Sequence, residues 1–262
     1  MAGEVAPDAA HRPAASQPWS RQQGPDAGVL WQTLREVVSS AVARTGRARL
    51  DVVDVGGGTG GFAVPLASLG HSVTVVDPSP DSLAAAQRRA AEAAVPLLAV
   101  QGDVSDLAAV TGGAEADLVL CHSVLEYVDD PAAAMTAIAG LLRPGGAVSV
   151  LAASLIAAVI HRVLAGRFAE ARKLVAALDR GSAAGDVTPR RFTLPAVIEL
   201  IEKAGLRPGP QHGVGVFTGL VPAGLADADP GAAGALAALE EAASAHPAFR
   251  GMAAQFHVLG FR

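Results

Sequence analysis

Short runs of β-branched and other apolar residues alternate along the first 152 residues with segments in which apolar residues recur at helical spacing. The runs read LDVVDV, SVTVVD, LLAVQGD, ADLVLCH and GAVSVLA. Helices are predicted over residues 28–43, 62–69, 80–93 and 131–142. Strands that alternate with helices of this length are joined by right-handed crossovers and form a parallel sheet. The pattern therefore predicts an α/β fold with a mostly parallel sheet.

The alternation ends after residue 152. Residues 154–178 predict one or two helices, which a loop at 179–191 and a helix at 194–204 follow. Two late runs, GVGVF and QFHVLGF, flank a predicted helix of about residues 231–245, and an antiparallel pair would close one edge of the sheet. We expect a disordered tail at 1–25 and a single domain at 26–262. Its predicted parts are a cofactor-binding core (26–152), a helical cap (153–192), and C-terminal helices and edge strands (193–262).

Composition narrows the class of protein. The chain has 262 residues, of which 51% are hydrophobic, and a formal net charge of -5. This mild acidity gives no general reason to expect nucleic acid or an anionic membrane as a partner. The single cysteine, Cys121, fits a reducing compartment. The longest apolar run, residues 147–160, is shorter than the roughly 20 residues that a membrane-spanning helix needs. We expect a soluble cytoplasmic protein without a metal ion.

The first candidate site is the glycine-rich segment VVDVGGGTGG, residues 52–61, which follows the first predicted strand. Gly56, Gly58 and Gly61 match the G-x-G-x-x-G pattern. Such a turn lets the backbone approach a ligand and directs helix N–H groups toward it. A tight turn without a ligand is the alternative.

Two acidic residues strengthen this interpretation. Asp77 ends the second predicted strand, where a carboxylate can accept hydrogen bonds from two ribose hydroxyls. The alternative is that it only caps the next helix, a role also open to Ser79 and Asp81. In QGDV, Asp103 could accept a hydrogen bond from an adenine amine and Val104 could contact the ring, or Asp103 could cap a short helix.

His122 follows the fourth predicted strand, at the end of the sheet where ligands bind in open α/β folds. Taken together, DVGGGTG (54–60), Asp77, QGD (101–103), HSVLEYV (122–128) and LRPGG (142–146) resemble the ordered motifs of class I S-adenosylmethionine-dependent methyltransferases. The resemblance implies a Rossmann-like, seven-stranded sheet and the cofactor S-adenosyl-L-methionine. It implies cofactor contacts from Asp54, Gly56, Gly57, Gly58, Gly60, Asp77, Pro78, Gly102, Asp103, Val104 and His122.

A closer resemblance extends beyond this core. LWQTLREVV, HSVLEYVDDP, VIHRVLAGRF, TPRRFTL, GVGVF and a late FHV are similar to segments of bacterial tRNA 5-carboxymethoxyuridine methyltransferases. That family implies a carboxylate acceptor on a modified wobble uridine of tRNA and places His161 on the cap helix. A small-molecule acceptor with a carboxylate or hydroxyl stays open.

The acceptor decides whether a base is needed. A carboxylate is already ionised near neutral pH, whereas a hydroxyl needs a group that removes its proton, for which histidine is suited. His122 and His161 are the catalytic candidates, although His161 could simply be a polar residue at a helix end. Two other functions share the glycine turn and the ribose acid: an NAD-dependent oxidoreductase, and a cofactor-binding module without catalysis.

Overall fold

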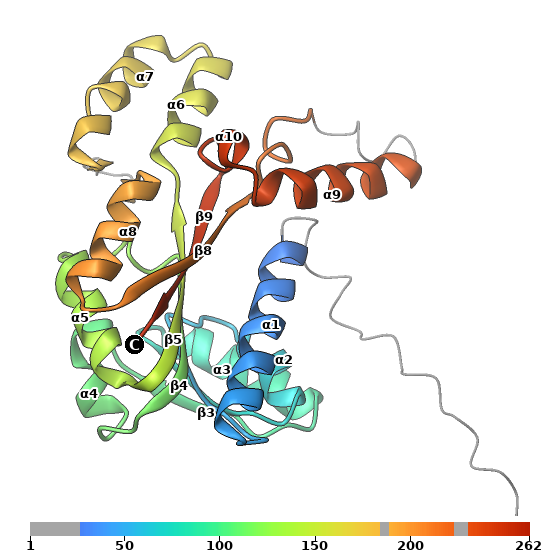
Figure 1. The fold of residues 1–262 in the computed structure, drawn as a ribbon, viewed down its shortest axis with the longest axis vertical. Helices are drawn as coiled ribbons and strands as arrows, with labels where there is room; N and C mark the ends of the chain where they lie inside the picture. The colour runs from blue at the N-terminus through green and yellow to red at the C-terminus, as the bar shows by residue number, and fades with distance from the viewer. Residues whose placement is uncertain (1–26, 184–188, 223–229) are drawn as a thin grey trace, which may run out of the picture.

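A seven-stranded sheet organises the protein in a computed structural model that describes residues 27–183, 189–222 and 230–262. Its strands lie in the order β3-β2-β1-β4-β5-β9-β8 (Figure 1). Their bounds are β1 Asp51–Val55, β2 Ser72–Asp77, β3 Leu98–Gln101, β4 Ala116–His122, β5 Leu142–Ala153, β8 Arg207–Val214 and β9 Gln255–Phe261. β1 to β5 pair in parallel, whereas β9 is antiparallel to both β5 and β8. The predicted Rossmann-like α/β class and its antiparallel edge are confirmed.

Helices cover the two faces of the sheet and enclose two hydrophobic cores. One core contains side chains of α1 (Ala27–Thr45), α2 (Ala63–Ser68) and α3 (Pro80–Glu92). The other contains those of α4 (Leu107–Val110), α5 (Pro131–Leu141) and α8 (Leu194–Lys203). The central strand β4 is buried at every position from Ala116 to Cys121, as expected of a parallel strand with both faces covered.

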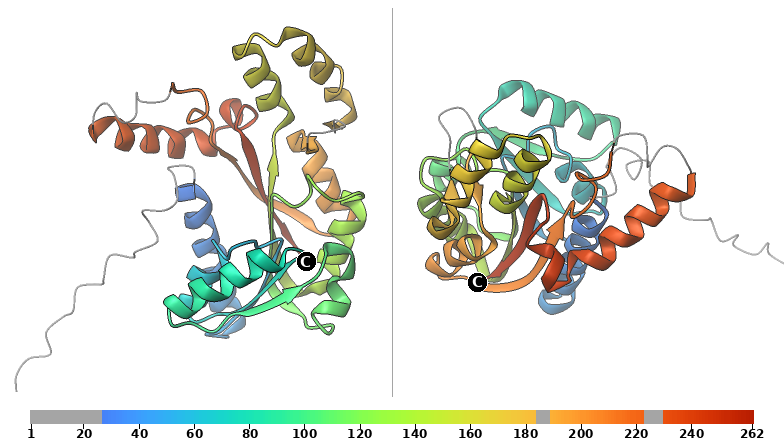
Figure 2. Two further views of the ribbon diagram at one scale, coloured as in Figure 1. Left: turned by 180° about the vertical axis from the view of Figure 1, so that it is seen from behind. Right: turned by 90° about the horizontal axis from the view of Figure 1, so that it is seen from above.

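The remaining elements extend beyond the carboxyl ends of the parallel strands. α6 (Leu155–Leu164) follows β5 directly, and α7 (Phe168–Val175) packs beside it, so the segment predicted as one or two helices forms two. α9 (Pro230–Ser244) and α10 (Pro247–Arg250) lie between β8 and β9 in the chain, and α9 points away from the α6–α7 pair (Figure 2). The short elements are η1 (Val104–Asp106), η2 (Leu178–Arg180), β6 (Ser182–Ala183) and β7 (Arg191–Phe192).

Two element boundaries differ from the sequence prediction. β5 begins at Leu142 and continues through the Pro-Gly-Gly segment. The pairing of β5 with β4 is irregular there, and its register shifts between Ala116 and Leu118 of β4. The strand predicted at 213–217 begins earlier, at Arg207, and ends at Val214, because Gly215 adopts a φ of +69°, which an extended strand cannot accommodate. The predicted tail at 1–25 and part of the loop at 179–191 lie outside the described residues.

Within the described ranges, no helix is both long enough and apolar enough to cross a membrane.

Candidate functional site

The glycine turn after β1 is packed too tightly for side chains at two positions. A Cβ on Gly56, whose φ is +63°, would lie 2.5 Å from Cγ2 of Val124 in the loop after β4. A Cβ on Gly57 would lie 2.7 Å from the carboxyl carbon of Asp54. The protein's own packing therefore requires these glycines, and the resulting turn presents bare backbone at the carboxyl end of the sheet.

Asp77 connects this turn to the end of β2. Its Oδ2 accepts a hydrogen bond from the Gly58 N–H at 2.9 Å, and its Oδ1 accepts one from the Ser79 N–H at 2.9 Å. The side chain that caps α3 is that of Ser79, whose Oγ accepts from the Ser82 N–H at 3.2 Å. Asp77 is thus not the helix cap. Each carboxylate oxygen can accept a further hydrogen bond.

A cavity of about 220 Å³ opens beside Asp77, where β1, β2, β3 and β4 end. Six of the predicted cofactor residues line it: Gly56, Asp77, Pro78, Gly102, Asp103 and Val104. Ser123, Val124, Tyr127 and Val128 from the loop after β4 complete the lining, along with Val55 and Val76. Asp54, Gly57, Gly58, Gly60 and His122 do not line this cavity. The topology thus brings together four segments that lie far apart in the sequence.

Asp103 has the capping role weighed from the sequence, whereas its contact with an adenine amine stays a prediction. Its Oδ1 caps η1 by accepting a hydrogen bond from the Ser105 N–H at 3.1 Å, and the residue also lines the cavity. The cap holds the segment that follows β3 against the cavity wall.

Asp54 lies beneath the glycine turn and is almost fully buried. Burial, followed by the charge of Asp77, raises the pKa of Asp54 from 3.8 to about 7. Its Oδ2 has no hydrogen-bond partner among the described residues. A buried carboxyl oxygen in this state can accept a hydrogen bond from a donor or a cation that enters the site.

His122, at the end of β4, is held by contacts on two sides. Its Nε2 lies 2.8 Å from Oγ of Ser149 on β5, and its ring packs edge-on against Phe62, with 4.8 Å between centroids. Nδ1 is buried and has no partner among the described residues, and burial lowers the pKa of the ring to about 3. His122 is therefore a neutral imidazole with one nitrogen uncommitted.

His161 lies elsewhere, exposed in the last turn of α6. A Cβ on Gly219 would lie 3.2 Å from its Cε1, so the loop after β8 approaches this ring. No hydrogen bond or ring contact between described residues joins His161 to His122.

Sequence reasoning missed two groups of polar residues near this end of the sheet. Glu126 is buried, and its Oε1 accepts a hydrogen bond from the Ala153 N–H at 2.6 Å, which ties the loop after β4 to the end of β5. Burial raises the pKa of Glu126, while backbone hydrogen bonds and the charge of Arg191 oppose that rise. Ser149 and His257 are the second group, and both are fully buried in strands. The sequence did carry signals for both groups: Glu126 is an acid within the apolar segment VLEYV, and Ser149 and His257 are single polar residues within apolar strands.

Comparison with known proteins agrees with this geometry. Residues 53–150 match a family described as a methyltransferase domain. Residues 53–150 are thus similar to a methyltransferase domain. Over 142 residues, 53% of this chain and 52% of the relative, the chain is 32% identical to the tRNA 5-carboxymethoxyuridine methyltransferase of Escherichia coli K12. Over 97 residues, 37% of this chain and 38% of the relative, it is 39% identical to the ubiquinone biosynthesis O-methyltransferase of Methylobacterium nodulans.

The chain thus spans about half, or less, of the length of these curated relatives. Among solved structures, the magnesium protoporphyrin IX methyltransferase of Synechocystis PCC 6803 with bound SAH matches with a TM-score of 0.58 and 15% identity, covering 95% of this chain and 90% of that one. A plantazolicin methyltransferase complex matches with a TM-score of 0.59 and 12% identity, covering 93% and 87%. At such identities the likeness shows the fold alone.

The residues at this end of the sheet fit the cofactor S-adenosylmethionine. The uncommitted Oδ2 of Asp54 suits the ammonium group of the methionine part, and the Asp77 carboxylate at the cavity suits a ribose diol. Gly56 lines the same cavity as Asp77. These residue assignments stay predictions.

Proposed function

We propose that this chain transfers the methyl group of S-adenosylmethionine to an oxygen acceptor, a carboxylate or a hydroxyl. The observation that carries the proposal is the Asp77 carboxylate, which is held at the cavity by the backbone N–H groups of Gly58 and Ser79. The bound cofactor supplies an electrophilic methyl carbon on a sulfonium. The chain itself orients the acceptor oxygen in line with that carbon and excludes water. The cytoplasmic location expected from the sequence belongs to the same proposal.

Between the two acceptor classes, the structure favours a small molecule over a modified wobble uridine of tRNA. Two cations of residues 153–192, the predicted cap, are already engaged. Arg190 donates hydrogen bonds to the carbonyls of Val128 and Asp129, at 2.7 and 3.2 Å. Arg167 forms an ion pair with Glu170 at 2.6 Å. Since each phosphate contact adds to affinity for a nucleic acid, cations committed within the protein weaken the case for tRNA.

Cofactor binding is tested by calorimetry with S-adenosylhomocysteine on the full chain and on Asp77→Asn. Loss of a charged hydrogen-bond acceptor costs about 1.5–3 kcal/mol, so we expect affinity to fall about 10- to 100-fold. Asp81→Asn, in the exposed first turn of α3, is the matched control and should bind like the parent. Unchanged affinity in a folded Asp77→Asn, or preferential binding of NAD by the parent, would refute the proposal.

Catalysis and acceptor class need separate measurements. Incubation with labelled cofactor and cell extract should yield a labelled product, whereas a binding module without catalysis would yield none. Filter binding to tRNA over a series of salt concentrations tests the acceptor class. A steep dependence of affinity on salt would point to the tRNA acceptor instead.

A further inference from the structure

A line of four polar side chains crosses the sheet from its centre to its edge. His122 on β4, Ser149 on β5, His257 on β9 and His212 on β8 belong to four strands that are adjacent in the sheet. Nε2 of His122 and Nε2 of His257 each lie 2.8 Å from Oγ of Ser149. The rings of His257 and His212 stack with centroids 5.6 Å apart, and their Nδ1 atoms lie 3.4 Å apart. The four groups form one continuous hydrogen-bonded chain, called the histidine chain below.

The interior of the histidine chain is neutral. Ser149 and His257 have no exposed surface. Burial, together with the neighbouring rings of His122 and His212, lowers the pKa of His257 well below its usual value. Because no charge is stable there, a proton can cross this part of the sheet only if each group receives one proton and passes on another.

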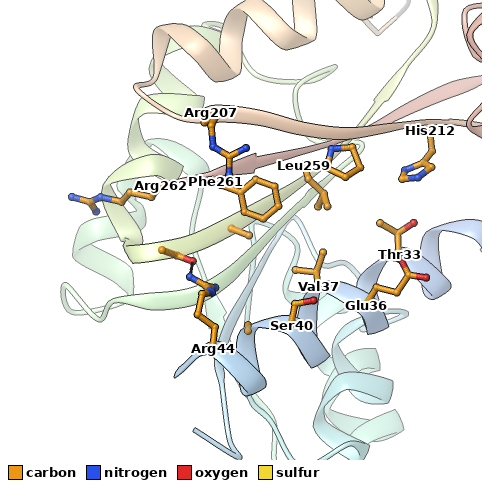
Figure 3. A pocket seen from close by; sticks show the side chains of 14 residues that line it. Thr33, Glu36, Val37, Ser40, Arg44, Arg207, His212, Leu259, Phe261 and Arg262 are labelled. Carbon is orange, nitrogen blue, oxygen red and sulfur yellow. Dashed lines mark hydrogen bonds between the residues drawn. The ribbon is translucent and has the colours of Figure 1, made fainter. Parts of the chain in front are cut away.

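The two ends of the histidine chain differ in their surroundings. At one end, Nδ1 of His122 is buried beside the carboxyl end of β4 and has no partner among the described residues. At the other end, His212 is half-buried and lines a groove of about 580 Å³ between α1 and the strands β8 and β9. Figure 3 shows His212 on the opposite side of this groove from Thr33 and Glu36 of α1. Water in the groove can reach His212.

Neutral imidazoles allow two arrangements that satisfy every interior hydrogen bond. In the first, His122 donates through Nε2 to Ser149, Ser149 donates to Nε2 of His257, and His257 donates through Nδ1 to His212. In the second, every donor and acceptor is reversed, and His122 carries its proton on Nδ1. A mixed arrangement leaves a buried donor or acceptor unsatisfied, at a cost of about 1–3 kcal/mol. The protonation of His212 and that of His122 are therefore coupled.

We propose that the histidine chain is a proton relay that makes Nδ1 of His122 the base for a hydroxyl acceptor, while His212 releases another proton to the groove so that no buried ring becomes charged. This inference rests on the proposed function and narrows its acceptor to a hydroxyl. His122 is the catalytic residue in this scheme. Because its Nδ1 is buried and the ring does not line the cavity beside Asp77, the scheme requires that the acceptor open a path to this atom when it binds. Ser149, His257 and His212 act through it.

The transfer starts from the first arrangement. The acceptor oxygen loses its O–H bond to Nδ1 of His122 and gains a bond to the methyl carbon, while the electrons of the broken C–S bond stay on sulfur. The Nε2 proton of His122 passes to Ser149, whose own proton passes to Nε2 of His257. The Nδ1 proton of His257 passes to His212, which releases its Nε2 proton to water in the groove. After the product leaves, His122 loses its Nδ1 proton to water, His212 takes one up, and the first arrangement returns.

Charged groups from several elements set the state of His212. Burial is the main cause that lowers its pKa, and Arg250 of α10 also lowers it, whereas Glu36 of α1 raises it. Glu241 of α9 lines an adjoining cavity with His212, and Arg44 of α1 and Arg207 of β8 line the groove. When the pH falls through the pKa of His212, the imidazolium must donate through Nδ1, which enforces the second arrangement. The proton then occupies Nδ1 of His122 and blocks its action as a base.

This coupling is tested without any acceptor, by ¹⁵N NMR of the full chain labelled at histidine. We expect the ring of His122 to switch to the Nδ1–H tautomer over the same pH range in which His212 titrates. In Ser149→Ala, His212 should still titrate while the tautomer of His122 no longer follows. Ser40→Ala, an exposed serine in the same groove, should behave like the parent. A tautomer of His122 that is independent of His212 in the parent would overturn the relay.

The reaction provides a second test, with labelled cofactor and cell extract as the probe. His212→Phe keeps the ring stacked on His257 but holds no proton, and its place on an edge strand makes it the safer variant if Ser149→Ala fails to fold. General-base catalysis contributes about 10²–10⁴-fold, so either variant should lose at least tenfold in rate near neutral pH and recover part of it at high pH, where the hydroxyl ionises unaided.

If both variants react at the rate of the parent, the relay is refuted. That is the result expected of a carboxylate acceptor, which is already ionised and needs no base. Calorimetry with S-adenosylhomocysteine on the same samples separates the two proposals. If the parent fails to bind it, the proposed function fails; if all variants bind it and their rates are equal, only the relay fails.

Discussion

Substitution of Gly56 by alanine isolates the close contact between the glycine turn and the loop after β4. Gly56 has a φ of +63°, and an added Cβ would lie 2.5 Å from Cγ2 of Val124. The left-handed conformation costs an alanine about 1–2 kcal/mol. Displacing the half-buried Val124 adds about 1–3 kcal/mol of overpacking. Gly56→Ala should therefore lower the free energy of unfolding by about 2–5 kcal/mol.

Gly58 provides the matched control. Its φ is +53°, but the atom nearest to an added Cβ, the Gly56 carbonyl oxygen, would lie 4.0 Å away. Gly58→Ala should thus show only the conformational cost, about 1–2 kcal/mol. Urea unfolding of both variants, followed by circular dichroism, measures the difference that is due to Val124.

The double variant tests the cause directly. The Cβ of Val124 would lie 3.8 Å from the new methyl of residue 56, an ordinary contact, so Val124→Ala removes the clash while keeping the loop. In a double-mutant cycle, Val124→Ala should restore about 1–3 kcal/mol to Gly56→Ala. Equal losses for the two glycine variants, or no recovery in the double variant, would refute the steric argument.

Two further predictions concern buried carboxyl groups. Because the pKa of Asp54 rises from 3.8 to about 7 on folding, the folded state binds its proton more tightly, and stability should fall by up to about 4 kcal/mol as the pH rises from 4 to 8. Asp54→Asn should remove that dependence, which urea unfolding at several pH values measures; an unchanged slope would contradict the assignment. The Glu240 carboxylate accepts hydrogen bonds from the N–H groups of Val216, Phe217 and Thr218. Glu240→Gln should therefore lower the free energy of unfolding by about 2–3 kcal/mol. The control variant, Glu241→Gln at an exposed position, should change it by less than about 0.5 kcal/mol. Similar losses in the two variants, compared by thermal unfolding, would show that Glu240 does not hold this segment.

The parallel half of the fold could be predicted because its strands are buried on both faces. Such strands read as short continuous apolar runs, and the turns and helices between them have their own signals: Ser79 before α3 and Asp130 before α5 both act as N-caps. The carboxyl ends of these strands meet at one cavity, which is why the sequence could predict that Asp77 and Asp103 lie close together.

The antiparallel edge was harder to predict, for a physical reason. β8 carries two prolines and two glycines within RPGPQHGV, a composition that signals a loop, and only pairing with β9 makes it a strand. Single polar residues within apolar strands were visible, but the contacts of the histidine chain could not be predicted, because Ser149, His257 and His212 lie far apart in the sequence and meet only when the sheet is assembled.

The place of β9 between β5 and β8 has a consequence for biosynthesis. In the described sheet, β8 pairs with β9 and with no other strand. When the ribosome has synthesised β8 but not yet residues 255–261, β8 therefore has no strand to pair with. Strands β1 to β5 can assemble first. β5 then stays an unpaired edge until β9 is synthesised and pairs with it.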